Sequence, residues 1–284
     1  MITYPEELEK MKKSTPARIG IGHTGARYTT SSALSFWADQ SKAADAVFSE
    51  VPQSVIQDLG VLEVHTKCQN KYEMLTRPDW GRIFEKETQQ TLLRHCVSDV
   101  DVQIYFGDGL CAPSIEANIP DLFPTLQMGL TDRGITVGTP FFVRYCRVNT
   151  ARTIGPLLHA KVCCVLIGER PGLLTSESMS AYIAYNARPD MSESDYTVVS
   201  NISRYGIPPV EAAAHIVDLI EEILRKQKSG VALQCATPML FCLRLCFALG
   251  FFCRTLRLTC SFCHFFCLRS RFSFADPFGI CTCF

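Results

Sequence analysis

The sequence predicts an α/β protein built on a doubly wound, mostly parallel sheet that follows a small helical segment. Three observations support this class. Residues 162–167 form an uninterrupted apolar run, which is typical of a strand buried on both faces of a sheet. From residue 100 onward, strand-like and helix-like patterns alternate, as parallel βαβ units require. Residues 30–95 instead repeat their apolar side chains mainly at helical spacing.

Length and composition restrict the function. A chain of 284 residues can hold one large domain or two modest ones. Its formal net charge is zero, so the composition shows no excess of basic residues that would indicate nucleic-acid binding. Residues 1–16 are polar and charged, unlike a signal peptide. Six of the 15 cysteines lie in residues 1–234, which is ordinary usage for a reducing compartment, and nine lie after residue 234.

Residues 1–29 predict a short charged helix, opened by Pro5, and a glycine loop. Gly20, Gly22 and Gly25 fit the G-x-G-x-x-G pattern of a dinucleotide-binding loop. That motif requires a buried strand before the glycines and a helix that starts among them. Residues 12–16 make a poor strand and the next helix starts near residue 30, so we interpret the segment as a flexible loop, with nicotinamide binding as the alternative.

Residues 30–97 predict a helical domain. Ser31 or Ser32 can cap its long first helix, which can break near residue 40. We expect Trp37 and Trp80 to be core residues. Three further elements follow: a helix over residues 52–59 that ends at Gly60, a strand or extended link over 61–66, and a helix over 83–96.

Residues 98–234 alternate strands and helices. The expected strands cover residues 102–106, 141–145, 161–167, 182–185 and 197–200. The expected helices cover residues 118–130 and 151–159, and residues 176–181 can form another. Pro208 and Pro209 open the last helix, which has one apolar stripe and ends at Gly230.

Polar side chains gather at the expected strand ends: Asp108, Arg144, Arg147, Glu169, Arg170 and Glu177. The run 162–167 stops at Gly168, and ligands of open α/β sheets bind beyond the carboxyl ends of the strands. Glu169 and Arg170 can therefore meet a ligand, or they can cap the strand and pair with each other. Residues 1–234 contain no nucleophile elbow, phosphate loop or zinc-ligand spacing, so the pattern predicts a ligand-binding domain without catalytic or metal-ligating residues.

Five strings carry a resemblance to a known family: TPFFVRY at residues 139–145, GERPGL at 168–173, SES at 176–178, SNI at 200–202 and PPVEAAA at 208–214. In this order they resemble the small subunit of ethanolamine ammonia-lyase. The resemblance extends from about residue 5 to residue 233.

The resemblance implies a Rossmann-like, cobalamin-contacting domain over residues 98–234 and a lyase that depends on adenosylcobalamin. In that family the cofactor's cobalt–carbon bond breaks, the adenosyl radical takes a hydrogen from ethanolamine, and acetaldehyde and ammonia are released. The implied partner is an ethanolamine ammonia-lyase large subunit, which carries the substrate site, while this chain covers the corrinoid. No nucleic acid or membrane is implied as a partner. The implied location is the cytoplasm, with the inside of a bacterial microcompartment also possible. Because the chain starts almost at the first family helix, we expect no N-terminal encapsulation signal.

Carried over by position, the family's cobalamin contacts fall on Val148, Glu169 and Val198. Glu169 can accept hydrogen bonds from the cofactor, whereas Val148 can offer only packing or its backbone. At the third position the family has a cysteine, and this sequence has Val198-Val199, so either valine can take the place. The D-x-H-x-x-G loop by which some corrinoid domains supply a histidine to cobalt is absent from the sequence.

Two other functions stay open. One is a purely structural partner that stabilises a large subunit without touching cofactor. The other is a nicotinamide-dependent oxidoreductase that uses Gly20, Gly22 and Gly25.

Residues 235–284 contain nine Cys and eleven Phe and match nothing in the family. Their apolar stretch, residues 239–253, is shorter than the roughly 20 residues that span a membrane and is interrupted by Arg244. Their C-x-x-C-H-x-x-C string lacks the second pair of a zinc site. We therefore expect a non-native, out-of-frame tail that is disordered and prone to aggregation.

Overall fold

The computed structural model describes residues 5–15 and 17–235. The chain divides into two units, Met1–Gln234 and Cys235–Phe284, and the fold described below is that of the first. The predictions for the tail therefore concern residues that lie outside the described part.

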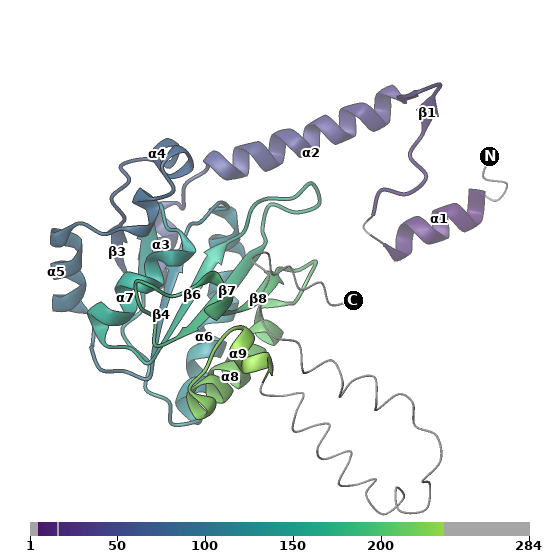
Figure 1. Ribbon diagram of the computed structural model, residues 1–284. Coiled ribbons are helices and arrows are strands. Elements are labelled where there is room, and N and C mark those ends of the chain that lie inside the picture. Colours follow the sequence, from purple (N-terminus) through teal and green to yellow (C-terminus); the bar gives the residue numbers. More distant parts are fainter. Residues whose placement is uncertain (1–4, 16, 236–284) are drawn as a thin grey trace, which may run out of the picture. The chain divides into compact units, whose positions relative to one another are not determined.

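A mixed six-stranded sheet forms the centre of this unit (Figure 1). In spatial order its strands are β3 (Leu62–His65), β5 (Phe141–Arg144), β4 (Val102–Gly107), β6 (Val162–Gly168), β7 (Met179–Tyr185) and β8 (Tyr196–Ile202). The first four strands run parallel, whereas β7 is antiparallel to β6 and β8 is antiparallel to β7. The predicted α/β class is confirmed. The sheet is mixed, because only the pairings among its first four strands are parallel.

Nine helices and a small hairpin complete the described part. The helices are α1 (Pro5–Ser14), α2 (Thr30–Phe48), α3 (Gln53–Leu59), α4 (Lys71–Thr76), α5 (Lys86–His95), α6 (Pro113–Asp132), α7 (Ala151–Leu158), α8 (Pro209–Lys226) and α9 (Val231–Cys235). Short 3-10 turns are η1 (Trp80–Arg82), η2 (Val148–Thr150) and η3 (Glu193–Asp195), and the hairpin pairs β1 (His23–Thr24) with β2 (Arg27–Tyr28).

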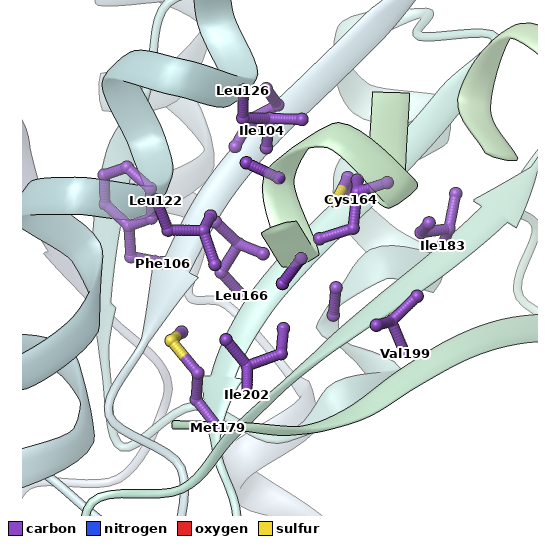
Figure 2. Close-up of a cluster of buried hydrophobic side chains, with 14 of the residues drawn as sticks. Ile104, Phe106, Leu122, Leu126, Cys164, Leu166, Met179, Ile183, Val199 and Ile202 are labelled. Carbon is purple, nitrogen blue, oxygen red and sulfur yellow. The ribbon is translucent and has the colours of Figure 1, made fainter. Parts of the chain in front are cut away.

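Both faces of the sheet are covered by apolar side chains. Alternate residues of β6 enter two different clusters: Cys164 and Leu166 pack with α6 and α8, while Cys163 and Val165 pack with α5 and α7. Figure 2 shows the first cluster, in which Leu122 and Leu126 of α6 lie over the strands. All seven residues of β6 are buried, so the predicted strand buried on both faces is confirmed.

The structure decides three of the predictions on helices and strands. Residues 61–66 do contain a strand, β3, which pairs with β5 at the sheet edge. The possible helix over 176–181 is wrong, because Met179 and Ala181 belong to β7 and pair with β6. The last helix ends at Lys226, before Gly230, with Gln227 in the left-handed conformation.

The N-terminal segment also differs in part from the prediction. Helix α2 runs without a break, capped by Thr29, whose side chain accepts a hydrogen bond from the backbone of Ser32. Trp37, predicted as a core residue, is 60% exposed. The prediction was wrong because Ala46 is the one residue of α2 that is buried, so this helix has no core-facing stripe within the described residues.

The glycine loop lacks the geometry of a dinucleotide site. The described residues before Gly20 form helix α1 and a bend, with no strand, and the next helix begins only at Thr30. Gly20 and Gly25 have positive φ and flank the first strand of the hairpin. Among the helices of residues 5–15 and 17–235, none combines the length and the apolarity needed to cross a bilayer.

Candidate functional site

A cavity of about 240 Å³ lies at the carboxyl ends of the parallel strands, and we call it the strand-end pocket. Its walls come from the loops after three adjacent strands: Gly109 follows β4, Val148 follows β5 and Glu169 follows β6. Tyr182 of β7 completes the lining. Ligands of open α/β sheets bind in this position. The structure therefore brings Val148 and Glu169, two of the three predicted site residues, to one pocket.

Glycines let these loops approach one another closely. Gly109 has φ of 53°, and a Cβ there would lie 2.3 Å from the carbonyl oxygen of Gly168. A Cβ on Gly168 would lie 2.3 Å from the carbonyl oxygen of Cys111. Any side chain at either position would push the loop after β4 away from the loop after β6. The floor of the pocket is thus backbone packed on backbone.

The carboxylate of Glu169 is held by its own chain. It accepts hydrogen bonds from the hydroxyls of Ser178, at 2.6 Å, and Ser180, and from the backbone N–H of Asn201 at 3.0 Å. These donors come from β7, the residue before it and β8, so Glu169 joins the ends of three strands. Arg170 is exposed and forms no ion pair with Glu169 in the described part of the chain. The alternative in which the two charges pair is therefore not what the structure shows.

The third predicted residue lies beside the pocket. Val198 is 44% exposed and is the cross-strand partner of Tyr182, which lines the pocket. Val199 is buried in the cluster on the opposite face of the sheet. Because neighbouring side chains on a strand point to opposite faces, only Val198 has an accessible side chain on the face of Tyr182.

Besides the exposed Arg170, the pocket wall contains a second arginine, Arg147. Its Nη2 donates to the carbonyl of Met74 at 2.8 Å and its backbone N–H donates to the carbonyl of Gly81 at 3.0 Å. Its Nε is buried without a hydrogen-bond partner among the described residues. Burial lowers the pKa of Arg147 from its ordinary value, because it disfavours the charged form.

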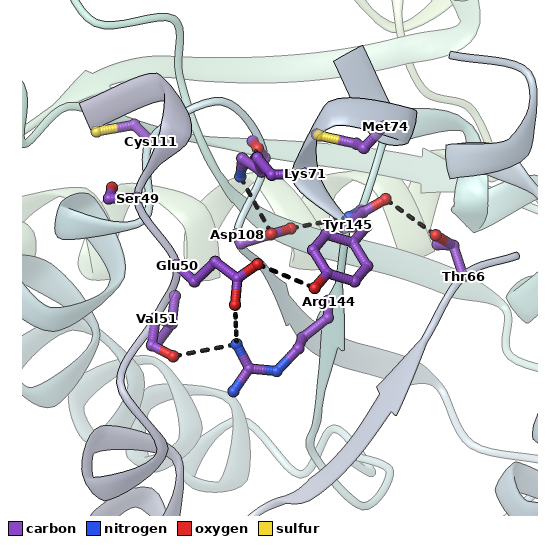
Figure 3. A network of polar contacts seen from close by, with 12 residues as sticks. Ser49, Glu50, Val51, Thr66, Lys71, Met74, Asp108, Cys111, Arg144 and Tyr145 are labelled. Carbon is purple, nitrogen blue, oxygen red and sulfur yellow. Dashed lines mark hydrogen bonds and ion pairs between the residues drawn. The ribbon is translucent and has the colours of Figure 1, made fainter. Parts of the chain in front are cut away.

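Behind the pocket, a buried ion pair joins Lys71 and Asp108. Lys71 Nζ lies 3.1 Å from Asp108 Oδ2, and the two residues are 4% and 2% exposed (Figure 3). Asp108 was among the predicted strand-end groups. Lys71 was missed, because a lysine in a charged helical stretch carries no local signal of burial.

The other strand-end groups lie elsewhere. Arg144 forms an ion pair with Glu63 and donates to the carbonyl of Val51 at 3.1 Å. Glu177 Oε2 lies 3.3 Å from Arg204 Nε in a partly exposed ion pair. Three of the six predicted strand-end residues line the pocket: Arg147, Glu169 and Arg170. Asp108 lies behind the pocket, and Arg144 and Glu177 lie outside it.

The pocket offers binding groups and no nucleophile. Burial raises the pKa of Cys146 to about 12 and also raises the pKa of Tyr182, so both side chains stay neutral at physiological pH. A neutral phenol, a hydrogen-bonded carboxylate, two arginines and apolar side chains suit a bound ligand with amide, hydroxyl and hydrocarbon groups.

The comparisons with known proteins agree on one family. The family model described as "Ethanolamine ammonia-lyase light chain" matches residues 5–234. A relative from Clostridium tetani, named ethanolamine ammonia-lyase small subunit, is 48% identical over 229 residues, which are 81% of this chain and 78% of the relative. Relatives of the same name from Clostridium perfringens and Clostridium acetobutylicum are each 47% identical, over 79% and 81% of this chain and 76% and 95% of their own lengths.

The matched region includes every residue of the strand-end pocket, together with the buried pair Lys71 and Asp108. The resemblance seen in the five strings is thereby confirmed over residues 5–234. The chain belongs to the ethanolamine ammonia-lyase light chain family.

Proposed function

We propose that this chain is the small subunit of an adenosylcobalamin-dependent ethanolamine ammonia-lyase and that its strand-end pocket contacts the corrinoid. The complex with a large subunit converts ethanolamine to acetaldehyde and ammonia. The observation that carries the proposal is the convergence of Val148 and Glu169 on one pocket at the carboxyl ends of β4, β5 and β6. In this reading the sheet serves as a Rossmann-like binding scaffold, whose ligands lie at that edge.

The strand-end pocket is large enough for the edge of a corrinoid and too small for the whole cofactor. A cavity of about 240 Å³ is smaller than the roughly 300–1,000 Å³ that encloses a drug-sized ligand, so it can take only part of the cofactor. Arg147 and Arg170 line the pocket, and guanidinium groups are donors that suit the carbonyl and phosphate oxygens of such a ligand. Val148 and Val198 would pack on hydrocarbon, and the one lone-pair site left on Glu169 Oε2 would accept from an amide or hydroxyl group.

A second protein chain must supply the rest of the site. Apolar side chains of the N-terminal segment support such a partner: Tyr28, Leu34, Trp37 and Phe48 are each more than half exposed. Exposed apolar groups at this density commonly mark surfaces that another protein covers. We propose the large subunit of the lyase as that chain.

The division of labour follows from what the pocket contains. When bound, the cofactor supplies the radical chemistry of the reaction. The residues of this chain bind and orient one side of the cofactor, and their apolar walls exclude water from it. The thiol of Cys146 and the phenol of Tyr182 in the pocket stay neutral and supply no nucleophile, which is consistent with a substrate site on the large subunit.

The test is co-purification of the full chain with an ethanolamine ammonia-lyase large subunit. Adenosylcobalamin uptake is followed by its visible absorbance, and acetaldehyde release is measured with ethanolamine as substrate. We expect activity only when both chains are present, and weaker uptake for Glu169→Ala. A stable complex that takes up no adenosylcobalamin would refute the contact with cofactor.

One observation favours the alternative of a purely structural partner. The carboxylate of Glu169 already has three donors from its own chain, so its role can be to hold the strand ends together. In that case Glu169→Ala lowers the stability of the subunit and leaves the affinity of the complex for adenosylcobalamin unchanged. The nicotinamide alternative has no such support, because the glycine loop lacks the strand and helix that it needs.

The proposed location is the cytoplasm or a microcompartment within it. All six cysteines of the described side chains are buried and unpaired, which is typical of a protein from a reducing compartment.

A further inference from the structure

We propose that Lys71 and Asp108 are positioning residues: their buried ion pair holds the Val148 wall of the strand-end pocket at its working distance from the Glu169 wall. The inference rests on the proposed function, because it assigns to the pair the shape of a corrinoid-binding pocket. Neither side chain lines the pocket itself. The pair acts through the backbone of the loop after β5.

Asp108 connects three segments through its two carboxylate oxygens. Oδ1 accepts a hydrogen bond of 2.8 Å from the backbone N–H of Cys146, two residues before Val148. Oδ2 accepts from Lys71 Nζ at 3.1 Å, and the same Nζ donates to the carbonyl of Gly109 at 2.8 Å. Figure 3 shows Lys71 and Asp108 pointing toward each other, linked by a dashed line. The ends of β4 and β5 and the start of α4 are thus joined at one buried point.

The segment that leads to Val148 is also held by Glu50, which accepts from the Tyr145 hydroxyl at 3.0 Å, and by residues 66–81, the region around Lys71. Tyr145 has φ of 57°, and its carbonyl accepts from Thr66 Oγ1 at 3.1 Å. Arg147 donates to the carbonyls of Met74 and Gly81, which follow Lys71 in the chain. Loss of the ion pair therefore removes the Lys71 anchor that fixes the acceptor of the Cys146 N–H, and it loosens the α4 segment that holds Arg147. Val148 is the next residue and moves with them.

Stability alone does not require an ion pair at this place. Removing two charges from water carries a desolvation penalty, and replacement of a buried ion pair by apolar groups of similar volume is often neutral or stabilising. A buried pair can instead fix one arrangement among several, because each charge tolerates only positions near its partner. Here the arrangement that it fixes is the position of the loop after β5 relative to the loops after β4 and β6.

The experiment distinguishes an effect on the position of the loop after β5 from an effect on the stability of the fold. In the full chain assembled with its large subunit, Lys71→Met and Asp108→Asn are combined, so that no charge remains buried and the volumes are kept. Thermal denaturation reports stability, and titration with adenosylcobalamin, followed by visible absorbance, reports affinity. We expect a denaturation midpoint close to that of the unmodified complex. We expect the dissociation constant to rise by about 10- to 100-fold, the range seen when outer partners of metal-site ligands are lost.

A matched control lies at the other end of the same strand. Asp101 precedes β4 and pairs with Lys161 at 2.7 Å, far along the strand from the pocket. Asp101→Asn is expected to leave the dissociation constant unchanged. If the double variant does not assemble, Lys71→Gln combined with Asp108→Asn keeps uncharged hydrogen-bonding groups at both positions, and it must show the same direction of change.

The outcomes are distinct. A weaker affinity in the Lys71 and Asp108 variants only, at matched denaturation midpoints, supports the inference. Unchanged affinity in the double variant overturns it while the proposed function stands. An equal loss in Asp101→Asn also overturns it, because the effect is then general. An unmodified complex without adenosylcobalamin uptake overturns the proposed function, and this inference with it.

Discussion

Glu169 Oε2 accepts a hydrogen bond of 2.6 Å from the hydroxyl of Ser178, the residue that precedes β7. The other oxygen accepts from Ser180 and from the backbone of Asn201 on β8. A single carboxylate at the end of β6 therefore binds the two strands that complete the sheet. The same residue lines the strand-end pocket, so its structural role and its proposed binding role must be separated by experiment.

Substitution of Glu169 by alanine tests both roles. Ser178 and Ser180 are 8% and 1% exposed, and a buried donor left without its partner costs about 1–3 kcal/mol. We expect Glu169→Ala to lower the free energy of unfolding by an amount in this range, measured by urea denaturation. The combined variant Ser178→Ala and Ser180→Ala loosens the same contacts but keeps the carboxylate. If the affinity for adenosylcobalamin falls equally in both variants, direct contact between Glu169 and the cofactor is excluded.

The close backbone approach at Gly168 predicts a second effect. A Cβ there would lie 2.3 Å from the carbonyl oxygen of Cys111 and 2.6 Å from that of Asp108, and neither backbone atom can rotate away. We expect Gly168→Ala to destabilise the chain by about 1–3 kcal/mol, as overpacking does, and to weaken adenosylcobalamin binding. Gly172→Ala is the control in the same loop, because its Cβ would meet nothing nearer than 3.9 Å. Equal denaturation midpoints for the two variants would contradict the close packing of these loops.

Much of the fold could be predicted because its strongest sequence signals are local. The apolar run of β6 and the end of α3 at Gly60 were read directly from residue types. β7 was recognised only in its second half, because Ser180 and Ala181 have little intrinsic preference for strands. Their conformation is decided by pairing with β6, which is a tertiary contact.

The site was predictable in part for the same reason. Glu169 stands at the end of an obvious strand, so its place at a carboxyl edge follows from the pattern. Lys71 could not be found, since its burial depends on Asp108, which is 37 residues away. The exposure of Trp37 was equally hidden, because a large aromatic residue at helical spacing predicts a core contact unless another chain covers it.

The buried thiols predict low reactivity. Burial raises the pKa of Cys163 and Cys164 to about 12 and that of Cys96 to about 11, so almost no thiolate is present at pH 8. We expect these cysteines to resist iodoacetamide in the native protein and to react after unfolding in urea, where thiols have pKa values of about 8.5. Peptide mass mapping assigns the label to each residue. Rapid native labelling of Cys163 or Cys164 would contradict the described packing of β6.

The last prediction concerns acid stability. Hydrogen bonds from Lys161 and then Thr136 lower the pKa of Asp101 to about 2, below the value of about 3.9 in an unfolded chain. The unfolded state therefore binds more protons in this range, and the contribution of Asp101 to stability is present above about pH 4 and is lost as the pH falls towards 2. We expect the denaturation midpoint of the unmodified chain to fall more steeply between pH 4 and pH 2 than that of Asp101→Asn. Lys161→Met keeps the two hydrogen bonds from Thr136 and should give an intermediate slope. Identical slopes in all three proteins would show that Asp101 has the same pKa in the folded and unfolded chain.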